Sequence, residues 1–153
     1  RYLDVAKLVA LAVEIVTPPT SERNCFFTAI KMLAGEKAWC TKAVPAHQVE
    51  SVVFGVAAGS RVTSFDVASF ESNSVRQMCV EEVAADGTVG ATLVAWKHYG
   101  TCSGGSKPSN YTPATIAVET TAMRFKVSVR HIFGFNMNAG LAIFRATGAT
   151  PRS

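Results

Sequence analysis

The chain has few charged residues, and its cysteines form no paired motif. Asp, Glu, Lys and Arg make up 17% of the 153 residues, against about 25% in an average soluble domain. Its four cysteines lie far apart with no C-x-x-C pair, which excludes a zinc ribbon and a thioredoxin-like motif. A P-loop, a dinucleotide fingerprint, a hydrolase elbow and an H-E-x-x-H helix are also missing. We therefore expect neither a metal nor a cofactor.

Long hydrophobic runs and paired carboxylates are missing too. The apolar stretch Tyr2–Val16 contains charged residues and is too short to cross a bilayer. Glu81 and Glu82 are adjacent, so on a strand they would face opposite sides and could not act as a pair. The net charge of +4 permits contact with an anion such as RNA without requiring it.

The first 46 residues predict one or two helices. Residues 3–16 are apolar except for a narrow polar stripe, which favours a helix. Several of these residues are β-branched, so a buried strand is the alternative. Two consecutive prolines end this element. Ser21 or Asn24 can then cap a second helix, which ends at Gly35.

From residue 60 onward the pattern becomes that of β-strands. Short runs rich in valine and aromatic residues alternate with turn residues, as in an antiparallel sandwich or barrel. Pro45–Gly59 fits a helix and a strand equally well, and residues 100–110 predict an exposed, mobile loop. We expect a single domain, 1–153, with a helical segment 1–46 and a β-sandwich over 47–148. The predicted strands are Arg61–Phe70, Val75–Val83, Val89–His98, Thr115–Thr121, Ala122–Phe133 and Leu141–Thr147.

The segment Met123–Arg130 alternates strictly between apolar and polar residues. This period of two predicts a strand with one buried face and one wet face. The wet face carries cations that could meet phosphate groups, or that could simply be solvated and protect the strand from aggregation. These cations are Arg124, Lys126 and Arg130.

Residues Asn24–Leu33 resemble the nucleophile helix of viral papain-like leader proteases. That resemblance implies a cysteine endopeptidase with Cys25 as the nucleophile, His131 as the base and Asn136 as an orienting amide. Against it, His131 continues the apolar face of its strand, which is typical of a histidine held in a core. The glycine-flanked histidine loop of that family is also missing. We keep the protease as an alternative.

Several stretches resemble the jelly-roll coat proteins of small positive-strand RNA viruses, of the tymovirus, sobemovirus and satellite tobacco mosaic virus type. The stretches are Ser69–Arg76, Met78–Val80, Asp86–Trp96 and Ala139–Phe144, and the resemblance spans about residues 50–147. It implies a mainly β, antiparallel jelly-roll-like sandwich over about residues 48–148, with one or two N-terminal helices. The implied function is a structural capsid protein, not an enzyme, that self-assembles into an icosahedral shell.

The same resemblance implies partners and a location. The partners would be copies of the chain itself and genomic RNA, bound through phosphate contacts without reading bases. No membrane is involved, and the protein would lie in the virion after assembly in the host cytoplasm. Cys25 would be a packing residue on a helix that braces the sheet. Such proteins usually carry a basic N-terminal arm, and the sequence from Arg1 onward shows none. The cations expected to touch RNA are Arg1, Lys7, Arg23, Lys31 and Lys37.

A third possibility needs neither assembly nor catalysis. The same β-rich pattern suits a β-sandwich binding module, which would be a small monomer or dimer with an exposed ligand groove. We take the coat protein as the main interpretation, on the stretches quoted above, and keep this module as an alternative.

Overall fold

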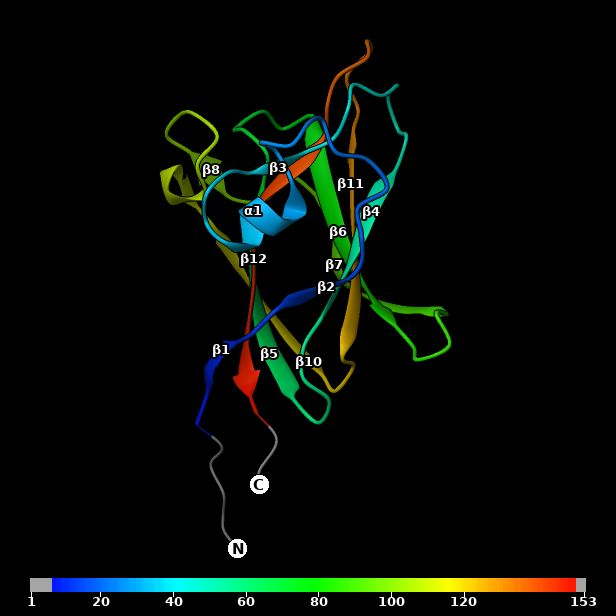
Figure 1. Ribbon diagram of the computed structural model, residues 1–153, viewed down its shortest axis with the longest axis vertical. Helices are drawn as coiled ribbons and strands as arrows, with labels where there is room; N and C mark the ends of the chain where they lie inside the picture. Colours follow the sequence, from blue (N-terminus) through cyan, green and yellow to red (C-terminus); the bar gives the residue numbers. More distant parts are fainter. Residues whose placement is uncertain (1–6, 151–153) are drawn as a thin grey trace, which may run out of the picture.

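The computed structural model describes residues 7–150, which fold into two facing antiparallel sheets of five strands each (Figure 1). The first sheet contains, in spatial order, β1 (Val9–Leu11), β12 (Gly140–Ala149), β5 (Arg61–Ser69) and β10 (Ala114–Thr120), with β3 (Trp39–Cys40) also paired to β12. The second contains β2 (Glu14–Thr17), β4 (Glu50–Gly55), β11 (Arg124–His131), β6 (Arg76–Val83) and β7 (Val89–Lys97). The remaining elements are α1 (Ala29–Leu33), β8 (Thr101–Cys102), the 3₁₀ turn η1 (Pro108–Asn110) and β9 (Tyr111–Thr112).

The predicted β-sandwich is confirmed, and its long strands lie close to where the valine-rich runs placed them. The ambiguous segment Pro45–Gly59 contains a strand, β4, because its valines alternate between the core and the outer face. Long-range pairing joins the first and last parts of the chain, since β12 lies between β1 and β5. With this strand order, neither sheet is complete until strands from the last part of the chain have paired with strands from the first part.

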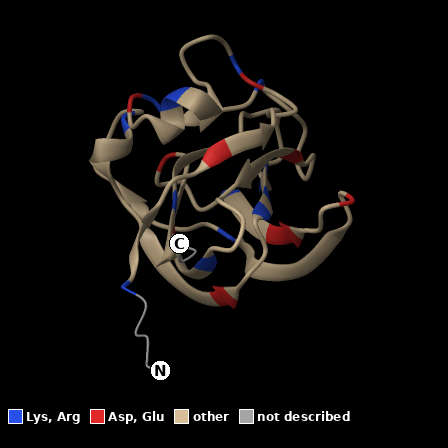
Figure 2. Cartoon of the chain, turned by 60° about the horizontal axis from the view of Figure 1, so that its bottom comes forward, with Lys and Arg blue, Asp and Glu red and all other residues tan. Residues whose placement is uncertain are grey.

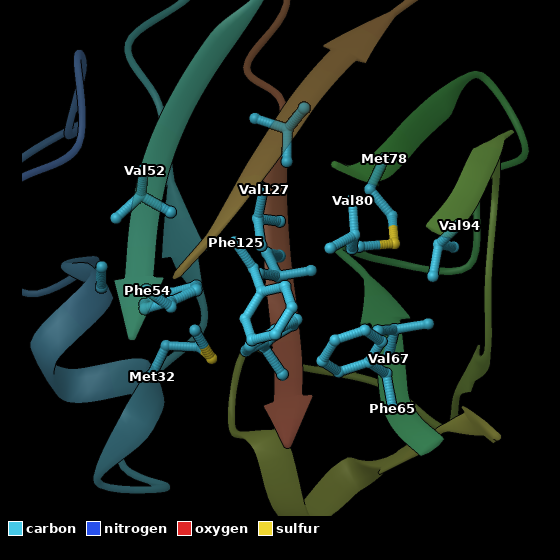
Figure 3. Packing of buried hydrophobic residues seen from close by; sticks show 14 of the residues in the cluster. Met32, Val52, Phe54, Phe65, Val67, Met78, Val80, Val94, Phe125 and Val127 are labelled. Atoms are coloured by element: carbon cyan, nitrogen blue, oxygen red, sulfur yellow. The ribbon is translucent and has the colours of Figure 1, made fainter. Parts of the chain in front are cut away.

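Aromatic side chains from both sheets fill the space between them. Phe54 of β4 stacks on Phe144 of β12 with ring centroids 4.9 Å apart. Phe65 of β5 meets Phe125 of β11 edge to face at 5.1 Å. Each pair crosses from one sheet to the other, and such pairs contribute about 0.5–1.5 kcal/mol beyond the area they bury. Figure 3 shows the rings of Phe54, Phe65 and Phe125 among Val52, Val80 and Val127.

The predicted helix over residues 3–16 is wrong where the structure describes it. Residues 9–11 and 14–17 form β1 and β2, two short strands that pair with β12 and β4 respectively. The β-branched valines and isoleucine of this stretch suit a sheet edge better than a helix. The rest of this prediction, residues 3–6, lies outside the described residues, as does Arg1.

The second predicted helix is shorter than expected. α1 has five residues, and Thr28 caps it by accepting a hydrogen bond from the Lys31 amide at 3.2 Å. Neither Ser21 nor Asn24 is the cap. Gly35 does follow the last turn, as predicted, with a φ of 76° that favours glycine. The helical segment 1–46 is thus mostly strand and irregular chain within residues 7–46.

Strand β11 has the predicted alternation. Phe125, Val127 and Val129 are fully buried, whereas Arg124, Lys126 and Arg130 are only partly covered. Ser128 departs from the pattern because it is buried on the outer face of the sheet.

The two ends of the sandwich differ in structure. In Figure 1, α1, β3 and β8 gather at one end, and β1 and the last residues of β12 lie toward the other. We call the first of these the loop end. Within residues 7–150, helices are too short or too polar to span a bilayer.

Candidate functional site

A pocket of about 530 Å³ opens at the loop end of the sandwich. Three segments that are distant in sequence surround it: the chain before α1, the turn after β5 and the hairpin that follows β8. It combines aromatic rings, one carboxylate, one guanidinium and several hydroxyls. The lining residues are Arg23, Phe27, Phe70, Glu71, Ser72, Asn73, Cys102, Ser103, Gly104, Gly105 and Ser106.

The hairpin wall of the pocket is held at both its base and its tip. β8 and β9 pair at the base, and the Ser103 amide donates to the Asn110 carbonyl at 2.9 Å. At the tip, the Ser106 carbonyl accepts the Ala38 amide at 2.8 Å. Gly104 and Gly105 have φ values of 136° and 78°, a combination that only consecutive glycines adopt without strain. The segment predicted as an exposed loop, residues 100–110, is mostly exposed; it begins with β8, ends with η1 and is irregular between them.

The opposite wall is a turn with a strained backbone. Glu71 has a φ of 58°, in the left-handed region that a glutamate rarely adopts. The Tyr111 hydroxyl stabilises this conformation by accepting the Glu71 amide at 2.8 Å. Burial raises the pKa of Tyr111, so its hydroxyl stays a neutral phenol. Backbone strain of this kind concentrates at binding and catalytic sites.

A buried arginine fixes the side chain of Glu71. Arg76, which is 5% exposed, donates to the Glu71 carboxylate at 2.7 Å. It also donates to the carbonyl and to the side-chain oxygen of Asn138 at 2.8 and 2.6 Å, and it lies 5.3 Å from the ring centroid of Phe70. Each nitrogen of the Arg76 guanidinium thus donates a hydrogen bond within the fold, and Arg76 holds the Glu71 carboxylate in place at the pocket wall.

The third wall is formed by Arg23 and the ring of Phe27, and a second cation, Lys37, lies near the same ring outside the pocket lining. The Arg23 guanidinium lies 5.1 Å from the ring centroid of Phe27, and the Lys37 ammonium lies 5.8 Å from it. The Lys37 ammonium also donates to the Ser106 hydroxyl at 3.3 Å, which links this wall to the hairpin. Burial raises the pKa of Cys40, beneath this wall, to about 11, although Arg23 and Arg76 nearby oppose the rise. The thiol is therefore neutral and adds no charge.

Neither of these two cations is balanced by a carboxylate. The ion pairs formed among residues 7–150 are Lys31–Glu36, Arg61–Glu119 and Arg76–Glu71. Arg23 and Lys37 belong to none of them. Since Arg76 already neutralises Glu71, the pocket has an excess of positive charge.

Chemically, this arrangement offers groups that can bind a polar ligand. Over residues 7–150, no group of three His, Cys, Asp or Glu side chains stands close enough to hold a metal ion. The thiol of Cys102 lines the pocket, where its sulfur accepts the Gly104 amide at 3.3 Å. The remaining groups can donate and accept hydrogen bonds, offer an aromatic surface and attract an anion.

The structure does not bring together the residues of the protease hypothesis. His131 is fully buried; its Nδ1 accepts the Phe133 amide at 3.1 Å and its Nε2 donates to the Val44 carbonyl at 2.6 Å. Both ring nitrogens are thus used, and neither is available as a base. Cys25 is exposed in the irregular chain before α1, and Asn136 lies in the exposed loop after β11. The expectation that Cys25 packs on a helix against the sheet is therefore wrong.

The cations predicted to touch RNA lie at several separate places. Lys7 is exposed just before β1, and Lys31 on α1 pairs with Glu36 at 3.9 Å. Arg23 and Lys37 come together at the pocket, whereas Arg1 lies outside the described residues. Figure 2 shows basic and acidic residues interspersed over the described chain, not collected on one basic face.

Sequence reasoning missed most of the pocket. Arg23 and Lys37 were singled out only as cations, while Phe27, Glu71 and the hairpin were not connected with them. One local signal was available: residues 100–110 form a loop rich in glycine and serine, and binding residues lie on loops more often than on strands.

Comparison with known proteins identifies the fold. The chain matches no family model, and it matches no curated protein in sequence. It is similar to the DNA repair protein XRCC1 in its structure with the DNA polymerase β catalytic domain, with a TM-score of 0.63 and 15% identity over 95% of this chain and 100% of that one.

Two carbohydrate-related structures are also similar. A GH29 fucosidase from Ruminococcus gnavus in complex with fucose matches with a TM-score of 0.62 and 16% identity, over 91% of this chain and 25% of the fucosidase. The chitosan-binding module 1 of a Paenibacillus chitosanase/glucanase matches with a TM-score of 0.55 and 14% identity, over 91% of this chain and 98% of the module. At these identities the likeness concerns the fold alone.

Proposed function

We propose that the protein is a non-catalytic β-sandwich binding module that takes a saccharide in the pocket at the loop end. The observation that carries the proposal is the pocket itself. A ring from Phe27, the hydroxyls of the hairpin and the fixed carboxylate of Glu71 face one cavity of about 530 Å³. Sugar sites need this mixture, because a sugar ring has apolar C–H faces and a rim of hydroxyls that both donate and accept hydrogen bonds.

The fold relatives are consistent with this function. One is a module that binds chitosan, and another is part of an enzyme whose structure contains fucose. XRCC1, in contrast, is bound to a polymerase domain in its structure. The sandwich thus serves both saccharide and protein recognition among its relatives, and the pocket of this chain favours the saccharide.

We also propose that the sandwich is a jelly roll. The support is the strand order, in which late strands lie between early ones in both sheets: β12 between β1 and β5, and β11 between β4 and β6. If β1 is taken as the first of eight strands, followed by β4, β5, β6, β7, β10, β11 and β12, the sheets follow the orders 1-8-3-6 and 2-7-4-5, the arrangement obtained by folding a long hairpin over itself.

The saccharide function can be tested by closing the pocket. Ser72 is exposed, lines the pocket and makes none of the side-chain hydrogen bonds found among the described residues, so Ser72→Trp should fill the cavity without disturbing the fold. Ser74→Trp, two residues away and outside the lining, is the matched control. We expect the wild type and Ser74→Trp to bind the same members of an immobilised saccharide panel, and Ser72→Trp to bind none. The proposal is contradicted if the wild type binds no saccharide of the panel, or if Ser72→Trp binds the same saccharides as the wild type.

The coat function stays a prediction, and its test is assembly. Sizing the purified chain by light scattering separates the two functions, because a capsid protein should form particles of many subunits. A binding module should remain a monomer or a small oligomer at the same concentration.

A further inference from the structure

Resting on the proposed function, we infer that the saccharide is an acidic one, whose carboxylate or sulfate group binds the Arg23 guanidinium, with the Lys37 ammonium adding positive charge from just outside the pocket lining. The inference starts from charge. The pocket contains one neutralised ion pair, Arg76–Glu71, and beside it two cations that no carboxylate balances among residues 7–150. A neutral sugar would leave both positive charges unmatched, whereas one anionic group on the ligand would pair with them.

Both cations lie near the same aromatic ring. The Arg23 guanidinium, which lines the pocket, is 5.1 Å from the ring centroid of Phe27, and the Lys37 ammonium, outside the lining, is 5.8 Å from it. The Lys37 ammonium is also anchored to the Ser106 hydroxyl at 3.3 Å, on the hairpin wall. Arginine offers a planar fork of donors that matches a carboxylate or a sulfate, and lysine adds a point charge.

The opposite wall accounts for the sugar part of the ligand. Glu71 carries a carboxylate whose position Arg76 fixes at 2.7 Å, and a fixed carboxylate can accept hydrogen bonds from sugar hydroxyls. The pocket is thus positive on one side and hydrogen-bond accepting on the other. A ligand with an acidic group at one edge and hydroxyls at the other is complementary to both sides.

A long polyanion such as RNA fits this site less well. Binding to a phosphate backbone uses a row of cations along a groove. Here Lys31 is paired with Glu36, and the Glu71 carboxylate stands in the wall that a neighbouring phosphate would approach. Figure 2 shows acidic residues interspersed among the basic ones.

The experiment compares matched pairs of trisaccharides by isothermal titration: galacturonate with galactose, glucuronate with glucose, and a sulfated with an unsulfated galactose chain. We expect at least one acidic member to bind ten-fold or more tightly than its neutral counterpart at low salt. Arg23→Met should weaken that binding at least ten-fold and Lys37→Met several-fold, while Arg61→Met, an exposed arginine outside the pocket, should leave it unchanged. Raising the salt concentration should weaken the wild type more than Arg23→Met, which keeps only the Lys37 charge.

The outcomes distinguish this inference from the proposed function. Equal affinity for acidic and neutral members, abolished by Ser72→Trp, overturns the inference and keeps the saccharide module. Failure of every saccharide to bind overturns both. Inorganic sulfate binding as tightly as the acidic sugar and unaffected by Ser72→Trp, or a uridylate oligonucleotide binding more tightly than any sugar and weakened by Arg23→Met, also overturns it. Unchanged circular dichroism and melting temperature confirm that each variant is folded.

Discussion

The basic side chains of this protein fall into two groups that the sequence alone does not separate. Arg130 of β11 and Arg76 of β6 already have partners within the fold: Arg130 lies 4.1 Å from the ring centroid of Trp96, and Arg76 is held by Asn138. Those at the pocket, Arg23 and Lys37, contact an aromatic ring and no carboxylate among the described residues. The first group stabilises the sandwich, and the second remains available to a ligand.

The difference follows from where each group lies. A residue on a central strand has a neighbour on each side in fixed register, so its charge meets a partner through the sheet. Arg23 and Lys37 lie outside the strands, in segments whose neighbours come from distant parts of the chain. Replacing a residue of the first group should therefore lower the stability of the fold. Replacing a residue of the second group should lower the affinity for the ligand.

Replacing the buried arginine should have the largest effect on stability. Arg76→Met keeps much of the side-chain volume and removes the hydrogen bonds to Asn138 and Glu71. We expect the free energy of unfolding to fall by about 2–3 kcal/mol in urea titrations, because buried acceptors lose their donor. Arg61→Met, which breaks the exposed pair with Glu119, is the control and should cost less than about 1 kcal/mol. Equal losses of unfolding free energy in the two variants would show that Arg76 contributes no more to stability than an exposed arginine does.

Replacing the buried His131 tests whether its hydrogen bonds also stabilise the fold. His131→Asn removes the donor to the Val44 carbonyl and the acceptor of the Phe133 amide. The expected loss is about 2 kcal/mol of unfolding free energy, from unpaired backbone groups and lost packing. His47→Asn is the matched control, since His47 is exposed and asparagine tolerates its φ of 67°. A stable His131→Asn protein would mean that the ring is dispensable, and the protease hypothesis would need to be considered again.

The arginine on the outer face of β11 should have a smaller effect. Arg130→Met removes the contact with Trp96 and the hydrogen bond from Nε to Gln77 at 3.0 Å. Cation–π contacts at partly exposed sites are worth about 0.5–1 kcal/mol, and we expect a loss in that range in the same urea titration. Ligand affinity should not change. A fall in affinity similar to that of Arg23→Met would abolish the distinction between the two groups.

The smallest effect is expected at Lys126. Lys126 is the Cα partner of Glu81 in the register of β11 with β6, and it belongs to none of the ion pairs found within residues 7–150. Lys126→Met should therefore change the unfolding free energy by less than about 0.5 kcal/mol, as usual for a partly exposed charge. A loss above 1 kcal/mol would indicate a stronger cross-strand interaction than the geometry implies.

The sequence predicted the strands well because the pattern of a strand is local: apolar and polar residues alternate over a few neighbouring positions. The alternation of Met123–Arg130 places three residues in the core and leaves three cations partly covered, and the structure has both. The first strands were mistaken for a helix because a short, continuous apolar run fits either element. Only the pairing of residues 9–11 with β12, more than 130 positions later, decides between them.

The pocket could not be predicted in the same way, because its parts meet only in the folded chain. Arg76 reads as an ordinary strand residue, yet it is buried against Asn138, which lies 62 positions away. The link between Lys37 and Ser106 spans 69 positions. No local pattern encodes such contacts, so the sequence indicated cations and left open which of them the fold would use.

A crystal structure of the protein with the acidic trisaccharide that binds best tests the central claim most directly. The account predicts a sugar in the pocket, with its carboxylate or sulfate within hydrogen-bond distance of the Arg23 guanidinium and its hydroxyls toward Glu71. A sugar bound elsewhere on the sandwich, or one whose acidic group points to solvent away from Arg23, would contradict it.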